Sequence, residues 1–321
     1  MQAPFDVPVA RPGKRRPAVA SGVTRCRASV ARCREDRRLR IAVFHDLPSG
    51  GAKRSLYEVV RRLAQRHVVD VYSLSRAEHA FCDVRPFVRR HHAYRLAEPR
   101  LFGSPYGRLN ALQRWRGLYA VDALAGRIAA DMASGGYDVV YAQPSMQTQA
   151  PAVLRHLRTP AVYHVQEALR SAYEPTIVRP YANRGWRRAA DSVDPMIRLH
   201  RRALKRLDRA NTLAPKHLLA NSRFTADRVR RIYGRAAEVR YFGVDVELFQ
   251  PAQPAIASHG VLSVGALVPT KGFDFLVSAL GRIPSSTRPQ LRIVANASHP
   301  HEVGYLTLLA ASTGVQLVIE Q

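Results

Sequence analysis

The sequence predicts an α/β fold of two Rossmann-like, doubly wound domains that face one cleft. Two segments carry this prediction, RIAVFHDLPSGGAKRS at residues 40–55 and VLSVGALVPTKGFDFLVSAL at residues 261–280. Each reads as a strand, a glycine-containing turn and an amphipathic helix. Strand and helix patterns alternate along the rest of the chain, which is typical of parallel sheets with right-handed crossovers. Ligands of such sheets bind at the carboxyl ends of the strands, where we expect both turns to lie.

The first turn joins an apolar strand at 41–45 to a helix at 52–66. Gly50 and Gly51 lack side chains, so the backbone of this turn can approach a ligand closely. Ser-Gly-Gly-Ala is a common sequence by itself. Its recurrence as a second strand-turn-helix unit, a domain length away, is what indicates two similar domains.

The second turn favours a phosphate ligand. The apolar run that begins at Val261 predicts a buried parallel strand, and a helix is expected at 273–282. The start of that helix offers free backbone N–H groups and the positive end of the helix dipole. Lys271 adds an ammonium group and Gly272 leaves room for close approach. The alternative interpretation is a surface helix that simply begins at this turn.

The other elements follow in chain order, except for a long variable segment after residue 74 to which we assign no element. Strands are predicted at 68–74, 138–142, 161–165, 217–221, 291–295 and 315–319. Helices are predicted at 146–157, 195–210, 225–233 and 301–312. Residues 239–242 lead into the domain boundary. The resulting domains are a disordered basic tail at 1–39, an N-terminal domain at 40–243, a linker at 244–259 and a partial C-terminal domain at 260–321.

The formal net charge of +26 is strongly basic, but only five of the 50 basic residues are lysines, which suggests the coding bias of a GC-rich genome. No apolar run approaches the roughly 20 residues of a membrane span. The lack of a signal-peptide core predicts a cytoplasmic location. The three cysteines form neither a disulfide framework nor a metal-ligand spacing.

Two segments could form a cationic surface. The predicted helix at 195–210 belongs to a basic stretch at 184–209, and residues 85–119 mix arginines with aromatic side chains. Such a surface suits anionic lipid headgroups on the inner face of a membrane, while a solvated helix face is an equally good interpretation. For 85–119, a sugar platform or single-stranded nucleic acid also fits. The chain shows no helix-turn-helix, zinc or RNA-recognition signature, so we expect no nucleic-acid partner.

Five segments, in family order, resemble the retaining glycosyltransferases of the GT-B fold, glycosyltransferase family four. The resemblance covers residues 40–321 and is carried by IAVFHDLPSGGAKRSLYEVVRRL, YDVVYAQPS with PAVYHVQEALRSAYE, LLANSRFTADRVRRIYG, VRYFGVDVELFQP and VLSVGALVPTKGFDFLVSAL. It implies a hexosyltransferase-type enzyme that moves a sugar, with retention, from a nucleotide-diphosphate sugar to a glycan or lipid-linked acceptor. The nucleotide sugar is then a substrate, and no cofactor is expected.

The resemblance also implies roles for individual residues. Lys271 would pair with the donor diphosphate, and five glycines would line the donor site: Gly50, Gly51, Gly243, Gly265 and Gly272. Gln166 stands where many relatives place an active-site histidine, and with Glu167 it forms the expected catalytic pair. Arg170 would contact the acceptor. An exposed ion pair between Glu167 and Arg170 is the simpler alternative.

Two departures from the family pattern shape the remaining expectations. Relatives usually carry an arginine five positions before the phosphate lysine, where this chain has Ala266. The family's paired glutamates would lie beyond residue 321, so we expect a C-terminally truncated chain without transferase activity. No metal is expected, because no Asp-x-Asp motif is present. A basic nucleic-acid-binding protein and a GT-B nucleotide-sugar epimerase are the alternative functions.

Overall fold

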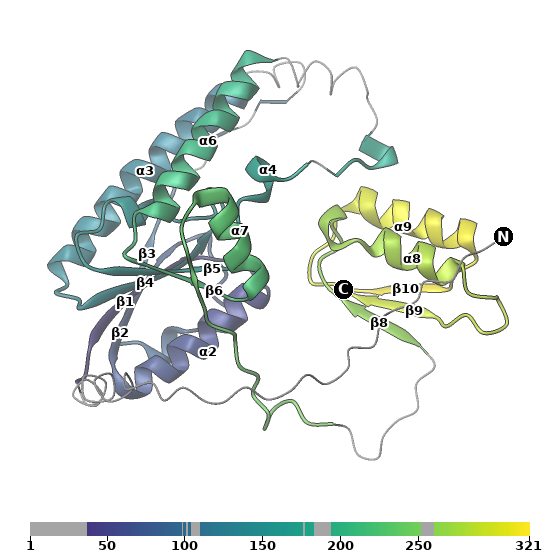
Figure 1. Ribbon diagram of the computed structural model, residues 1–321, viewed down its shortest axis with the longest axis horizontal. Helices are drawn as coiled ribbons and strands as arrows, with labels where there is room; N and C mark the ends of the chain where they lie inside the picture. Colours follow the sequence, from purple (N-terminus) through teal and green to yellow (C-terminus); the bar gives the residue numbers. More distant parts are fainter. Residues whose placement is uncertain are drawn as a thin grey trace, which may run out of the picture. The chain divides into compact units, whose positions relative to one another are not determined.

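The computed structural model describes residues 37–97, 99–100, 102–103, 110–175, 177–182, 194–251 and 260–321. The predicted basic tail therefore lies outside the described residues up to residue 36, and so does the predicted linker from residue 252 onward. The described residues form two parallel β-sheets with flanking helices (Figure 1).

The first sheet has seven strands in the order β3-β2-β1-β4-β5-β6-β7. Every neighbouring pair is parallel. The strands are β1 (Arg40–Asp46), β2 (Val68–Leu74), β3 (Arg90–Tyr94), β4 (Val139–Ser145), β5 (Ala161–Val165), β6 (His217–Ala220) and β7 (Glu238–Val239). The strand order reverses between β1 and β4, which is the point where open α/β sheets bind ligands. This doubly wound order confirms the predicted fold class.

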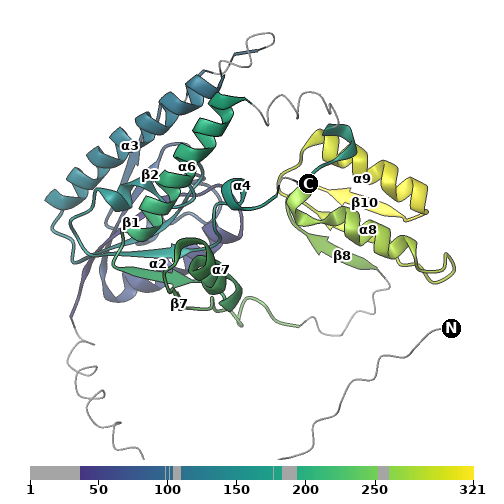
Figure 2. The same ribbon diagram turned by 45° about the horizontal axis from the view of Figure 1, so that its top comes forward.

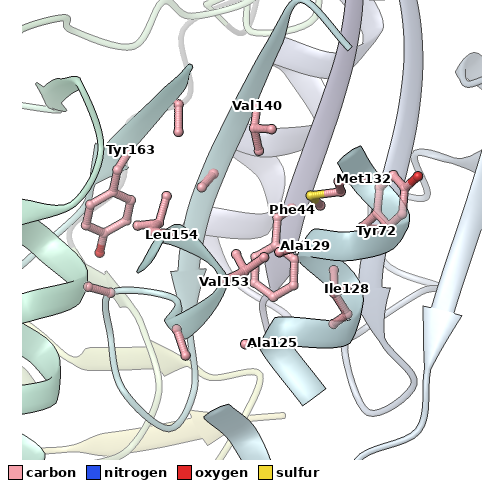
Figure 3. Packing of buried hydrophobic residues seen from close by; sticks show 14 of the residues in the cluster. Phe44, Tyr72, Ala125, Ile128, Ala129, Met132, Val140, Val153, Leu154 and Tyr163 are labelled. Carbon is pink, nitrogen blue, oxygen red and sulfur yellow. The ribbon is translucent and has the colours of Figure 1, made fainter. Parts of the chain in front are cut away.

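Within the described ranges, this sheet is accompanied by the α-helices α2 (Gly51–Arg66), α3 (Asn110–Ser134), α4 (Arg170–Tyr173), α6 (Pro195–Leu213) and α7 (Arg223–Tyr233). The sequence reading missed α3 and β3. In α3 the apolar residues are spread around the helix, so the 3.6-residue period is weak. Figure 3 shows Ile128, Ala129 and Met132 of α3 packed with Phe44 and Val140 of the sheet in the largest buried cluster.

The helix predicted at 146–157 is wrong. Only a short 3-10 turn forms there, at Ala152–Arg155. The chain turns back directly after β4, because the N–H of Ser145 donates to the carbonyl oxygen of Gln149 at 2.8 Å and Gln149 has a positive φ of 54°. Pro151 follows, and proline lacks the N–H that a helix interior needs.

The second sheet has three parallel strands in the order β10-β9-β8. They are β8 (Val261–Val264), β9 (Leu291–Val294) and β10 (Leu317–Glu320), with helices α8 (Phe273–Gly281) and α9 (Pro300–Thr313). Leu291 and Ile293 are fully buried in one cluster with α8 and α9. On the other face of β8, Leu262 and Val264 are 64% and 72% exposed. The prediction of a buried strand was therefore wrong, since β8 lies at the edge of the described sheet and packs on one face only.

A polar cluster lies between α2 and β1, with Lys53 and His45 buried in it and His79 and His91 partly buried at its side. Lys53 is 1% exposed, and among the described residues its Nζ has no hydrogen-bond partner. His45 is fully buried, and neither of its ring nitrogens has a hydrogen-bond partner in the same residues. The rings of His79 and His91 extend the cluster, with His79 at 6.3 Å from His45 and 5.1 Å from His91. Asp83 and Glu78 stabilise the charge of Lys53 in part, but desolvation has the larger effect and lowers its pKa. We therefore expect this buried ammonium group to reduce the stability of the fold.

Candidate functional site

The turn after β1 adopts an open conformation. Gly50 is the N-cap of α2 with φ 145°, a conformation that side-chain-bearing residues rarely adopt, and Gly51 begins the helix. A Cβ atom at either position would meet no atom within 4 Å, so the space beside the turn is free. The buried Asp46 at the end of β1 accepts a hydrogen bond from Ser145 Oγ at 3.1 Å, which joins the ends of β1 and β4.

A pocket of about 340 Å³ lies between the first turns of α2 and residues 242–249. Gly51 and Gly243 both line it, so the structure brings together two of the residues that the sequence singled out. Arg54 also lines the pocket, with its guanidinium 4.7 Å from the centre of the Phe249 ring. Arg62 and the carboxylates of Glu58 and Asp245 line it as well, so the pocket combines exposed backbone, charges of both signs and an aromatic ring, which suits a polar ligand.

Gln166 follows β5 directly, and both ends of its amide are held by neighbouring strands. Its Nε2 donates to Gln143 Oε1 of β4 at 3.0 Å, and its Oε1 accepts from Nδ2 of Asn221, which follows β6, at 3.1 Å. The side chain therefore has one fixed orientation. An amide Nε2 carries two hydrogens, so one of them remains for a ligand.

The hydrogen-bonded chain continues from Gln143 into the sheet. Gln143 Nε2 donates to Tyr141 Oη at 2.6 Å, and Tyr141 Oη lies 2.8 Å from His164 Nδ1. Burial lowers the pKa of His164 to about 4, so its imidazole is neutral at neutral pH. The His164 ring packs 4.9 Å from the ring of Phe242, the residue before Gly243. Gln166 is thus linked, through buried neutral groups, to the segment that lines the pocket.

Sequence reasoning did not assign roles to Gln143, His164 or Asn221. The sequence does show that all three are polar residues at or near the carboxyl ends of strands, namely β4, β5 and β6. Carboxyl ends of parallel strands meet at one edge, where polar residues are common in sites. The spacing alone could not show which of them touch.

Glu167 and Arg170 lie outside this network. Arg170 Nε donates to Glu167 Oε2 at 2.7 Å, and the two side chains are 46% and 47% exposed. Exposed pairs of this kind contribute about 0–1 kcal/mol to stability. The structure thus shows the ion pair that the sequence left as the simpler alternative, and the catalytic and acceptor roles of the two residues stay predictions.

The second set of predicted residues surrounds the turn before α8. Pro269–Lys271 form a 3-10 turn, and Gly272 adopts φ 70° as the N-cap of α8. The alkyl chain of Lys271 lies beside Gly265, where a Cβ atom would be 3.8 Å from Lys271 Cδ. Lys271 is exposed, and within the described part of the chain no ion pair engages it. The predicted start of the helix at Phe273 is therefore confirmed, and the diphosphate-binding role of Lys271 stays a prediction.

In the described ranges, no group of three or more histidine, cysteine, aspartate or glutamate side chains is arranged to hold a metal ion. None of the described helices is long and apolar enough to cross a membrane.

Comparisons with solved structures show the fold. Sucrose-phosphate synthase from Thermosynechococcus elongatus is similar over 88% of this chain and 71% of its own, with 18% sequence identity and a TM-score of 0.56. HepE from Anabaena, solved with UDP and glucose, is similar over 88% of this chain and 70% of its own, with 18% identity and a TM-score of 0.52. These likenesses confirm the GT-B architecture. No curated protein sequence matches the chain.

The family assignment comes from the sequence itself. The family described as Glycosyltransferase Family 4 matches residues 49–248, which is more than half of the chain. The matched range contains the glycine turn before α2, the Gln166 network and the segment around Gly243. The chain therefore belongs to glycosyltransferase family 4.

Proposed function

We propose that this glycosyltransferase uses a nucleotide-diphosphate sugar as donor, binds the donor diphosphate at the turn of residues 269–272, and transfers the sugar with retention to a glycan or lipid-linked acceptor. The observation that carries the proposal is the exposed Lys271 beside the N-cap of α8. A helix N-terminus and an ammonium group together favour an anion. The complex of Anabaena HepE with UDP-glucose supports this donor class.

The charge that develops on the leaving diphosphate gives Lys271 its chemical role. As the bond to the sugar breaks, negative charge grows on the diphosphate, and a preplaced cation lowers the energy of that transition state. Lys271 and the first N–H groups of α8 supply this stabilisation without a metal. Gly265 and Gly272 leave space for the phosphates, and Gly50, Gly51 and Gly243 leave space around the pocket beside α2.

Gln166 acts, in this proposal, as a fixed hydrogen-bond donor to the transferred sugar. Its amide cannot take up a proton as a histidine can. The remaining Nε2 hydrogen can, however, donate to a sugar hydroxyl in a fixed direction, because Gln143 and Asn221 hold the group. We place Glu167 beside it as the second catalytic residue and Arg170 at the acceptor.

Lys271→Ala should weaken the binding of UDP, GDP or ADP by about 1.5–3 kcal/mol, the contribution of a charge-assisted hydrogen bond. Isothermal titration of each nucleotide into the 321-residue chain measures the change. Lys216→Ala is the matched control, since Lys216 is an exposed lysine in the other sheet's unit. Equal nucleotide affinity in wild type and Lys271→Ala would remove Lys271 from the donor site.

We also propose peripheral attachment to an anionic membrane. Helices α3 and α6 lie side by side (Figure 2), which joins parts of the two predicted cationic segments. Trp115 and Tyr119 of α3 and Arg206 of α6 line a shallow groove between them. The predicted surface at 85–119 is otherwise divided, because residues 85–94 belong to a 3-10 turn and β3. Residues 184–193 lie outside the described ranges.

Charge reversal on α6 tests this attachment. Arg198 and Arg202 are exposed on α6, next to exposed Met196 and Leu199. Basic residues near an anionic membrane contribute about 1 kcal/mol each. Arg198→Glu/Arg202→Glu should therefore lose at least about 2 kcal/mol of affinity for phosphatidylserine vesicles in sedimentation.

The same two reversals on α7, at Arg230 and Arg231, serve as the charge-matched control. Attachment through α3 and α6 predicts that the α7 variant binds nearly as wild type does. Equal sedimentation of wild type with neutral and anionic vesicles, or with neither, would contradict it.

A further inference from the structure

Arg179 is a buried arginine from residues 177–182, which follow β5 in the chain. Its guanidinium donates in pairs to two carboxylates. Nη1 and Nη2 reach Asp274 at 2.6 and 3.0 Å, and Nε and Nη2 reach Glu302 at 3.1 and 2.8 Å. Nη2 also donates to the carbonyl oxygen of Pro269 at 3.2 Å. Arg179 is 5% exposed and Glu302 is fully buried, so water competes little for these contacts.

The acceptors of Arg179 surround the turn that carries Lys271. Pro269 opens that turn, Asp274 lies in the first turn of α8, and Glu302 lies in the first turn of α9. One guanidinium therefore joins the turn to the beginnings of both helices. Tyr181 strengthens the arrangement, because its Oη donates to Glu302 Oε2 at 2.7 Å.

Arg179 is not a substitute for the arginine that Ala266 replaces. All three of its side-chain nitrogens already donate to protein oxygens, and its single positive charge faces two carboxylates. A phosphate brought next to it would also meet the negative charges of Asp274 and Glu302. The geometry instead suits a residue that fixes the position of its neighbours.

The backbone bonds of the turn are all short-range, and the carbonyl oxygen of Gly272 accepts two of them from Phe275 and Leu276 of α8. The N–H of Lys271 donates to the carbonyl oxygen of Val268 at 3.0 Å, and the N–H of Gly272 donates to the carbonyl oxygen of Pro269 at 3.3 Å. Gly272 has the largest backbone freedom to lose when the turn is ordered. The hydrogen bonds of Arg179 to Pro269 and Asp274 are therefore expected to fix the backbone of the turn, and with it the direction of the Lys271 side chain.

We propose that Arg179 is a positioning residue that holds the turn of residues 269–272 so that Lys271 and the first N–H groups of α8 meet a nucleoside diphosphate. The proposal deepens the function proposed above and rests on it. Donor binding would then depend on residues 177–182, which belong neither to the second sheet nor to its helices.

The test compares Arg179→Lys and Tyr181→Phe with wild type in the 321-residue chain. Lysine keeps a charge near Glu302 but loses the paired geometry and the contact with Pro269. We expect backbone amides of Lys271 and Gly272 to exchange with deuterium at least tenfold faster in Arg179→Lys, while those of Leu291 and Ile293 in β9 keep their rates. UDP should bind at least tenfold more weakly. Arg292→Lys, at an exposed arginine of β9, is the matched control and should change neither property.

Amide exchange and nucleotide binding together distinguish a failure of this proposal from a failure of the proposed function. If wild type binds none of UDP, GDP and ADP, the donor function is contradicted, and amide exchange at the turn still decides whether Arg179 positions it. Unchanged exchange of Lys271 and Gly272 in Arg179→Lys would overturn the proposal. Equal acceleration at the turn and throughout β9 in both variants would overturn it as well, because that pattern indicates general packing.

Discussion

Replacing Arg179 with methionine should lower the free energy of unfolding of the three-stranded unit by about 3–5 kcal/mol, the cost of breaking a buried ion pair by removing one partner. Without Arg179, the fully buried Glu302 keeps only the hydroxyl of Tyr181 as a polar side-chain partner in the described structure. The side chain of Asp274 is 28% exposed and regains water more easily. Hydrogen exchange of the Leu291 and Ile293 amides in β9 measures the effect.

The double variant Arg179→Met/Glu302→Met is the control for this prediction. It removes both buried charges, so it should recover most of the lost stability, as apolar replacements of buried ion pairs often do. Equal β9 exchange in Arg179→Met and wild type would show that the buried pair contributes little. A double variant less stable than the single one would show that Glu302 tolerates burial alone.

Replacing Lys53 with methionine should have the opposite effect and stabilise the seven-stranded unit by about 2–4 kcal/mol. The ammonium group of Lys53 is buried with no hydrogen-bond partner in the described parts of the chain, and burial lowers its pKa. Methionine fills a similar volume with no polar group to desolvate. Urea denaturation followed by tryptophan fluorescence measures the gain. An unchanged or lower stability would show that the ammonium group is satisfied in solution.

The same cluster predicts acid sensitivity. Burial lowers the pKa of His45 well below its usual range, and it also lowers the pKa of His79 and His91. Between pH 7.5 and 5 these three histidines therefore bind more protons in the unfolded chain than in the folded chain, so their contribution to the free energy of unfolding falls as the pH falls through about 6.5. His45→Leu should flatten this dependence in denaturation curves at pH 7.5, 6.5 and 5.5.

Local sequence signals predicted much of the first sheet because its strands are short apolar runs with clear ends. The predicted bounds of β2 and β5 agree with the structure, and α2 begins within one residue of its predicted start. The failures have physical causes. α3 has no strong polar face, and the return of the chain at Ser145–Gln149 depends on a single backbone hydrogen bond and one positive φ.

The parts of the candidate site that are formed by the backbone of a turn could be predicted from the sequence. The parts that depend on contacts between distant segments could not. The glycine turns at Gly51 and Gly272 follow from short motifs, and the structure confirms that each begins a helix. The contact of Arg179 with Glu302 joins residues 123 positions apart. No local pattern encodes such a pair, because its formation requires both segments to be folded first.

The most direct measurement of the central claim is an NMR titration of the 321-residue chain with UDP, GDP and ADP. Donor binding at the turn before α8 predicts that the largest saturable changes occur at the amides of Gly265, Lys271 and Gly272, and that Lys271→Ala reduces them. Saturable changes confined to other residues would place the nucleotide elsewhere. The absence of any change with all three nucleotides at millimolar concentration would contradict a donor site in this chain.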